Sequence, residues 1–142
     1  MNIDEIEKLW EEDSIIDPDN LHLESIKIPS LHSKYYRIYN NISLLKKIEE
    51  NKFLELQQEK RLYYSGKASP EIYKENPFDH RVMKQDVDRY VNVDLDITKS
   101  TTKIDYYSLM LRFLESILKT IENRNYTIKN SIDFMKFIGG YS

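Results

Sequence analysis

The sequence contains no cysteine, and only three glycines and four prolines among its 142 residues. Without cysteine, the chain has no disulfide, no thiol nucleophile and no zinc–thiolate site. Few glycines and prolines mean few tight turns, which favours long helices over a sandwich of many short strands. The length is that of one ordinary domain. The sequence therefore predicts a mainly α-helical, elongated subunit, with residues 1–142 forming a single helical domain.

A long apolar run and a catalytic pattern are also missing. No segment reaches the roughly 20 apolar residues of a membrane-spanning helix, and the N-terminal stretch MNIDEIEKLW is acidic where a signal peptide is basic. The histidines, His22, His32 and His80, do not have metal-ligand spacing, and the chain has neither a phosphate-binding loop nor a nucleophile elbow. We therefore expect a soluble intracellular protein with no membrane contact, no enzymatic activity, no cofactor and no metal site.

The formal net charge of −3 is unevenly distributed along the chain. Residues 1–25 carry nine acidic residues and one basic residue, whereas residues 26–67 carry nine basic and four acidic residues. Residues 68–142 are balanced, with eleven of each sign. Because salt screens charges beyond a Debye length of about 8–10 Å, local charge governs the binding of a polyanion. The middle segment is therefore the candidate for nucleic acid, while the acidic segment could compete with phosphates, dock on a basic partner, or pack against the protein.

Apolar spacing predicts an acidic helix followed by a long helix within residues 1–66. An apolar stripe indicates a first helix over residues 3–13. A second helix follows Pro18, and Pro29 either kinks that helix or starts a new one. Near-heptad apolar spacing then extends a helix to about residue 65, with Gly66 as its C-terminal cap residue.

The segment 67–102 is predicted to be a loop region, with one ambiguous stretch. Apolar residues alternate with mostly acidic residues over 87–97, which is typical of a short strand. The same stretch could be an irregular start of the following helix, and the pattern alone does not choose between the two.

Residues 103–142 are predicted to form helices for packing and assembly. A helix with two apolar stripes needs neighbours on two sides, and a chain this short with few other apolar elements favours self-association. The candidate oligomerisation residues on these two helices are Ile104, Tyr107, Leu111, Leu114, Leu118, Ile121, Ile128, Ile132 and Met135.

The stretch QQEKRLYYSGKASPE, residues 57–71, gathers cations and aromatic rings at one helix end. Proteins that bind single-stranded nucleic acid combine cations that follow the backbone with aromatic faces on which bases stack. The helical spacing places Lys60, Tyr64 and Lys67 on one face if the last turn persists. An alternative is that the tyrosines are core residues and the lysines a solvated face. The candidate DNA-binding residues are Lys46, Lys47, Lys52, Lys60, Arg61, Tyr63, Tyr64 and Lys67.

Three segments resemble a known family in their order and spacing. They are HSKYYRIYN after the acidic helix, KRLYYSGK at the basic helix end, and RNYTIKNSIDFMKFIGG near the C-terminus. Together they span nearly the whole chain, although no single motif is diagnostic. The sequence resembles the UvsY family of recombination mediator proteins from T4-like bacteriophages.

The resemblance implies a non-enzymatic mediator of recombination, repair and replication in the cytoplasm of the infected bacterial host. Such a protein forms a ring-like homo-oligomer, a hexamer or heptamer, and binds single-stranded DNA. It helps a RecA-like phage recombinase to replace the phage single-strand binding protein. The resemblance also implies that two basic residues with one residue between them, just ahead of Tyr-Tyr-Ser-Gly, contribute to DNA binding. Here Lys60 matches the second of them, while the uncharged Gln58 stands at the first, with Arg61 adjacent to Lys60. A helical adaptor without DNA binding is the alternative function.

Overall fold

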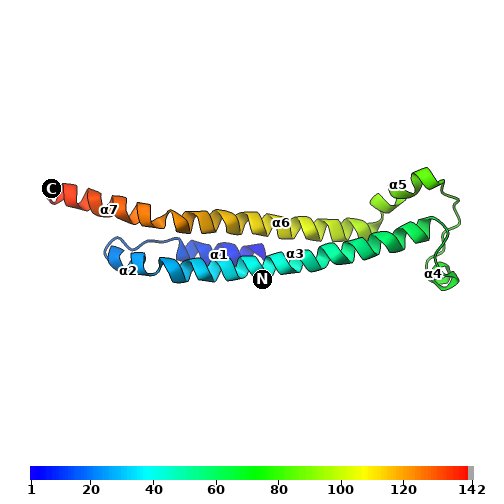
Figure 1. Cartoon of the computed structure of the whole chain (residues 1–142), viewed down its shortest axis with the longest axis horizontal. Coiled ribbons are helices and arrows are strands. Elements are labelled where there is room, and N and C mark those ends of the chain that lie inside the picture. Colours follow the sequence, from blue (N-terminus) through cyan, green and yellow to red (C-terminus); the bar gives the residue numbers. More distant parts are fainter. Residues whose placement is uncertain (141–142) are drawn as a thin grey trace. The chain divides into compact units, whose positions relative to one another are not determined.

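The computed structural model describes residues 1–140 as a set of helices joined by short connections (Figure 1). No strand occurs in this part of the chain, so the predicted mainly α fold class is confirmed. The helices are α1 (Ile3–Asp13), α2 (Leu21–Ile26), α3 (Ile28–Tyr64), α4 (Pro70–Glu75), the 3-10 helix η1 (Lys84–Asp86), α5 (Val87–Asn92), α6 (Leu95–Glu122) and α7 (Arg124–Ile138).

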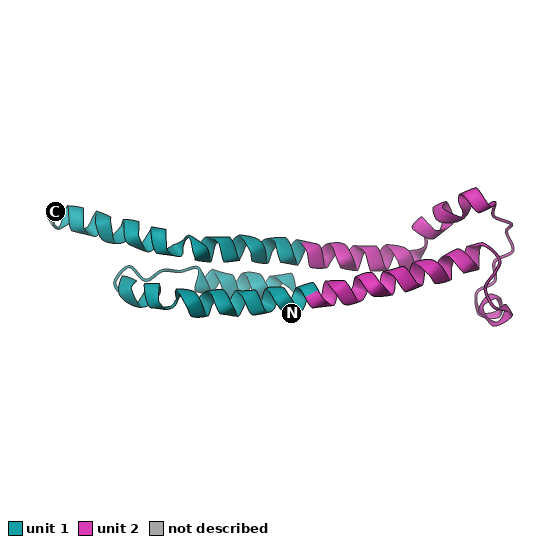
Figure 2. Ribbon diagram, in the orientation of Figure 1, with its two compact units in different colours: residues 1–43, 109–142 teal, residues 44–108 magenta. Residues whose placement is uncertain are grey.

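The packing divides the chain into two compact units (Figure 2). Unit 1 comprises Met1–Ser43 and the segment from Leu109 onward, and unit 2 comprises Leu44–Ser108. The boundary falls inside both long helices, α3 and α6. The single-domain organisation and the ring assembly stay predictions.

The beginnings of the N-terminal helices follow from their capping residues. α1 has the predicted bounds, and the side chain of Asn2 accepts a hydrogen bond from the backbone N–H of Glu5 at 2.9 Å, as an N-cap residue does. Pro29 starts a new helix instead of kinking an old one. It lies in the first turn of α3, where a proline removes no intrahelical hydrogen bond, and Lys27 separates α3 from α2.

The end of α3 is a Schellman motif around Gly66. The N–H of Lys67 donates to the carbonyl of Leu62 at 2.9 Å, and the N–H of Gly66 donates to that of Tyr63 at 3.2 Å. Gly66 has a φ of +76°, which strains any residue with a Cβ. The predicted cap residue is therefore confirmed. Because the helix stops at Tyr64, Lys67 does not continue its face, and the predicted alignment of Lys60, Tyr64 and Lys67 on one helical face is wrong.

Of the two alternatives for residues 87–97, the short strand is wrong and the irregular helical start is closer to the structure. α5 covers the first half of this stretch, and α6 begins at Leu95. Asp94 explains the restart, because its Oδ1 accepts hydrogen bonds from the backbone N–H groups of Asp96 at 2.9 Å and Ile97 at 3.4 Å. The alternation was misleading, since Val93 and Leu95 are about three-quarters exposed and do not share a buried face.

The predicted loop region 67–102 contains more helix than expected. α4, η1, α5 and the first turns of α6 all lie within it. The prolines misled the prediction, because Pro70 is the first residue of α4, a position that favours proline.

Each unit has its own hydrophobic core. The core of unit 2 consists of Val87, Val91 and Ile97, with Phe53, Leu56, Tyr64 and Val82 packed against them. The buried apolar side chains of unit 1 come from α1, α2, α3, α6 and α7, and they are Ile6, Leu21, Tyr35, Ile42, Met110, Leu111, Leu114, Ile117, Leu118, Ile121 and Ile128. Within residues 1–140, no helix is long and apolar enough to cross a membrane.

The acidic helix α1 packs against the other helices of unit 1. Ile6 is fully buried, and the Trp10 ring meets the Tyr35 ring edge-on at 5.4 Å between centroids. At the end of α1, the Asp13 carboxylate accepts a hydrogen bond from the Tyr35 hydroxyl at 2.8 Å and forms an ion pair with Lys34 at 2.6 Å. Of the alternatives for this segment, packing is therefore the one that these contacts support.

A buried arginine ties the connection after α1 to the start of α7. The Arg124 guanidinium donates to the carbonyls of Asp13 at 2.8 Å and Ile15 at 3.1 Å, and to the Glu24 carboxylate at 3.0 Å. Arg124 and Glu24 are each 6% exposed. Lys27 also approaches Glu24, at 3.3 Å. The guanidinium thus satisfies groups from three separate segments of unit 1.

Candidate nucleic-acid interface

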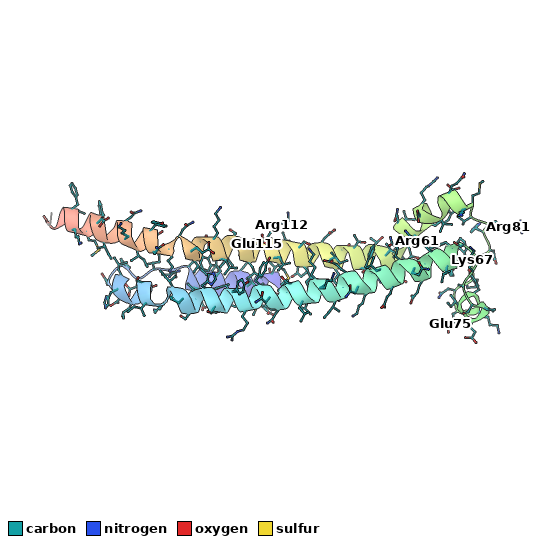
Figure 3. All side chains as sticks on the ribbon, in the orientation of Figure 1. Arg61, Lys67, Glu75, Arg81, Arg112 and Glu115 are labelled. Carbon is teal, nitrogen blue, oxygen red and sulfur yellow. The ribbon has the colours of Figure 1, made fainter. Side chains whose placement is uncertain are left out.

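The predicted basic cluster lies at the C-terminal end of α3, in unit 2. Figure 3 labels Arg61 and Lys67 in this region. Both side chains are exposed. Arg61 forms an ion pair with Asp88 at 3.3 Å, in which both partners are largely exposed to solvent. Such a pair contributes little to stability, so the guanidinium can exchange its carboxylate for a phosphate at small cost.

Lys60 lies deeper than its neighbours and is not free. Its Nζ lies 3.3 Å from the Asp94 carboxylate and 2.9 Å from the Asp96 carboxylate, and its side chain is 21% exposed. Burial lowers the pKa of Lys60, but the hydrogen bonds and charges of Asp96 and Asp94 outweigh it and hold the pKa above its ordinary value. Lys60 is therefore a charged group already neutralised by two carboxylates from the start of α6.

Asp94 is the centre of a small polar network. Its Oδ2 accepts a hydrogen bond from the Tyr64 hydroxyl at 2.6 Å, while its Oδ1 caps α6. Burial raises the pKa of Asp94, but the Tyr64 hydrogen bond, the α6 backbone and Lys60 hold it below the ordinary value of 3.8. This network fixes the end of α3 against the beginning of α6 within unit 2.

The two tyrosines are packed among other aromatic side chains. The Tyr63 ring is stacked on the Tyr73 ring at 5.3 Å between centroids, and the Tyr64 ring contacts Phe78 and Tyr90. The Tyr63 hydroxyl donates to the carbonyl of Asn76 at 2.9 Å. These contacts support the alternative in which Tyr63 and Tyr64 are packing residues, and base stacking on them stays a prediction.

A depression of about 780 Å³ opens beside this cluster, between the end of α3, α4 and the start of α6. Lys60, Lys67, Asp94 and Asp96 line it together with the tyrosines. A neighbouring groove of about 370 Å³ shares Asp96 and Glu59 with this depression.

The neighbouring groove contains two cations that sequence reasoning missed. Lys99 and Lys103 of α6 line it, together with the predicted Lys52 of α3. Lys99 and Lys103 are four residues apart and so lie on one face of α6. That spacing is visible in the sequence, but Lys99 falls in the predicted loop region and Lys103 at the first residue of the predicted C-terminal helices, so the pair was not recognised. Of the remaining predicted lysines, Lys46 pairs with Glu50 at 3.8 Å and Lys47 is exposed.

The structure divides the predicted oligomerisation residues into two groups. Leu111, Leu114, Leu118, Ile121 and Ile128 are buried within unit 1 by its own helices. Those five are therefore corrected to core residues, because the neighbours that the apolar stripes needed are supplied by the same chain. The others are more accessible: Ile104, Tyr107 and Ile132 are half-buried, and Met135 is exposed.

An exposed apolar surface remains on α7. Phe134, Phe137 and Ile138 are 62%, 80% and 68% exposed. Their spacing places them on one side of the helix, whereas the buried Ile128 lies on the other. Large exposed apolar patches are typical of interaction sites. This surface, which we call the α7 apolar face, was not singled out by the sequence analysis.

The described residues contain no cluster of metal-binding side chains. Within residues 1–140, no group of three or more His, Asp or Glu side chains could hold a metal ion. The lysine and arginine side chains of the site can bind an anion, which would compete for them with the carboxylates that they pair with here.

The carboxylates predict how stability depends on pH. Burial raises the pKa of Asp13, Glu24 and Asp94, but hydrogen bonds and nearby cations lower each below its ordinary value of 3.8 or 4.5. Their stabilising effect is therefore complete above about pH 4.5 and is lost as the pH falls through the lowered folded-state values. We expect the urea concentration at the midpoint of unfolding to decrease when the pH is lowered from 4.5. Asp94→Asn should show a shallower drop than the wild type, and an equal drop would contradict this assignment.

Within residues 1–140 the chain thus has a helical fold with a basic and aromatic helix end, a combination of side chains that binders of single-stranded nucleic acid use. A sequence model described as "Recombination, repair and ssDNA binding protein UvsY" matches residues 9–141. The chain belongs to this UvsY family of recombination proteins.

Individual relatives agree with the family over the whole length. The chain is 26% identical over 142 residues to the recombination protein uvsY of Enterobacteria phage T4, covering 99% of both sequences. Among solved structures, it is similar to crystal structures of the bacteriophage T4 recombination mediator protein UvsY. The lattice type II structure matches with a TM-score of 0.85 at 23% identity and 98% coverage of both chains. The lattice type I structure matches with a TM-score of 0.83 at 23% identity, covering 94% of this chain and 98% of the other.

Proposed function

We propose that this protein is a non-enzymatic recombination mediator that binds single-stranded DNA and promotes the loading of a RecA-like recombinase in place of a single-strand binding protein. The observation that carries this proposal is the family match over residues 9–141. The cations that line the two depressions of unit 2 support it. In this proposal the protein acts in the cytoplasm of the infected bacterial host. Its partners there are single-stranded DNA, the phage recombinase and the phage single-strand binding protein.

The DNA-contacting residues in this proposal are cations held by a packed aromatic frame. Arg61 and Lys67 are exposed and can neutralise phosphates directly. Lys60 contributes when it exchanges a carboxylate for a phosphate, and Lys46, Lys47 and Lys52 extend the row of cations along α3. Tyr63 and Tyr64 hold the end of α3 in place and line the depression.

Self-assembly compensates for the weakness of one site. A single subunit is net negative, and its cations are partly paired. In a ring-like hexamer or heptamer, several modest sites engage one strand, and the effective concentration of each later contact is high. The α7 apolar face, with Met135 and Ile132 beside it, is the surface that we assign to assembly.

A helical adaptor that does not bind DNA is the second candidate function. The packing of Tyr63 and Tyr64 and the pairing of Lys60 favour it, because these contacts explain the residues without any ligand. In this case the α7 apolar face alone would carry the function.

Replacing Arg61 and Lys67 together with alanine separates these candidates. We expect weaker binding to oligo-dT and a log–log salt slope that is smaller by about 0.7 for each lost phosphate contact. Both side chains are exposed, so stability should change by no more than roughly 0.5 kcal/mol. Fluorescence anisotropy at several salt concentrations measures the slope.

The matched control is the double variant of Arg112 and Lys119, which removes two exposed cations from α6 in unit 1. It should leave the slope near the wild-type value. Equal slopes for both double variants would remove the end of α3 from the DNA interface.

Loading of the recombinase is tested by following filament formation on single strands that are coated beforehand with single-strand binding protein. The wild type should shorten the delay before assembly, and the Arg61 and Lys67 double variant should shorten it less. A wild-type protein that binds DNA but leaves the delay unchanged would contradict mediation while leaving DNA binding intact.

A further inference from the structure

The two carboxylates at Lys60 differ in their other contacts. The Asp94 side chain is 8% exposed, caps α6 and accepts the Tyr64 hydroxyl. The Asp96 side chain is 58% exposed, and within residues 1–140 its one ion pair is with Lys60, at 2.9 Å. Asp94 is therefore built into the fold, whereas Asp96 is held at the surface by the lysine alone.

We propose that Asp96 is a displaceable carboxylate, which occupies on Lys60 the position of a DNA phosphate oxygen and thereby sets the affinity for single strands. This inference rests on the proposed function and adds to it a residue that lowers affinity. Binding then exchanges one anionic oxygen for another on the same ammonium group, while Asp94 stays in place.

The geometry allows the exchange. Lys60 and Asp96 both line the depression of about 780 Å³, so a phosphate can approach the pair from solvent. The ammonium group has three donors, and Asp94 uses one of them. Asp96 is the second residue of α6, and the positive end of the helix dipole favours an anion there. A phosphate that replaces the carboxylate is stabilised by the same positive end of the α6 dipole.

The released carboxylate also has another cation nearby. Lys99 lies three residues after Asp96 on α6, and both line the neighbouring groove. Residues at this spacing are neighbours on a helix surface. Lys99 has no ion pair within residues 1–140, so it can accept the carboxylate when a phosphate takes Lys60.

Other charges around the pair must be considered with it. Glu59 and Lys67 line the same depression, and Glu59 also lines the groove that contains Lys99. Glu59 forms no ion pair with Lys60, so Asp96 is the exposed acid that competes directly for its ammonium group. A neutral side chain at position 96 leaves Lys60 open on its solvent side.

The test compares Asp96→Asn with Asp105→Asn in oligo-dT binding by the full chain. Asp105 is an exposed acid on the same helix with no ion pair in the described chain, so its variant makes the same change in net charge. We expect Asp96→Asn to bind more tightly than the control by about two- to fivefold per contacting subunit, the factor that corresponds to an exposed ion pair.

Lys60→Gln distinguishes failure of this inference from failure of the proposed function. In the wild-type background it should weaken binding, and in the Asp96→Asn background it should abolish the gain. If Lys60→Gln weakens binding but Asp96→Asn matches Asp105→Asn or binds less tightly, the displaceable carboxylate is wrong and the DNA interface stands. If Lys60→Gln changes nothing while circular dichroism shows a folded protein, the displaceable carboxylate is wrong. If the Arg61 and Lys67 double variant also binds as the wild type does, the proposed DNA interface fails as well.

Asp96→Glu provides the second variant. It keeps the charge and can still reach Lys60, so its affinity should stay within the range of the wild type. A gain equal to that of Asp96→Asn would show that the effect is not caused by loss of the carboxylate, and would overturn the proposal.

Discussion

Arg124→Ala is expected to lower the free energy of unfolding by about 3 kcal/mol, near the lower end of the cost of breaking a buried ion pair. The variant leaves the Glu24 carboxylate buried and leaves the carbonyls of Asp13 and Ile15 without their donor. Lys27 stays 3.3 Å from Glu24, which is why we expect the lower end of the range. Urea denaturation followed by circular dichroism measures the change.

Arg112→Ala is the control for this variant. Arg112 lies on α6 in unit 1, is exposed, and has no ion pair within residues 1–140 (Figure 3). Its replacement should change stability by no more than roughly 0.5 kcal/mol. A loss of less than about 1 kcal/mol for Arg124→Ala would mean that water replaces the guanidinium, and would contradict its role in holding the α1–α2 connection.

Replacing Phe134 and Phe137 together with serine should dissociate the oligomer that we propose. Both rings are largely exposed on α7, so the substitutions leave the core of unit 1 intact. Loss of the oligomer removes the high effective concentration of the linked sites, and the apparent affinity for a long single strand should fall by about 10²-fold or more. Light scattering measures the mass, and anisotropy with long and short oligo-dT measures the affinity.

The control for assembly replaces Lys129 and Lys136 with glutamine on the same helix. It alters two exposed α7 residues outside the α7 apolar face and should retain the wild-type mass. An unchanged mass for the phenylalanine variant would show that α7 does not mediate assembly. A reduced mass with unchanged affinity for long strands would show that DNA binding does not depend on the ring.

The bounds of α1 and the end of α3 could be predicted from the sequence, because they depend on neighbouring residues. The spacing of Ile3, Ile6, Leu9 and Trp10 predicted α1, and Gly66 predicted the end of α3, because capping and turn conformations are determined by a few adjacent residues. The strand prediction over 87–97 failed for the converse reason. Only the contacts of Asp94 show that its side chain restarts a helix there.

Contacts between distant residues could not be predicted from the pattern. The sequence places Lys60 in a basic cluster, but its pairing with Asp94 and Asp96 joins segments more than thirty residues apart. The two apolar stripes of α6 were correctly identified as needing partners. Whether those partners come from the same chain or from another depends on tertiary packing, and the structure shows that much of the surface is covered within unit 1.

The most direct test of the account is light scattering on the size-separated wild-type protein, alone and with labelled oligo-dT. The account predicts a single oligomer of six or seven subunits that carries the labelled strand with it at low salt and loses it as salt rises. A monomer that is indifferent to oligo-dT at every salt concentration would contradict the account.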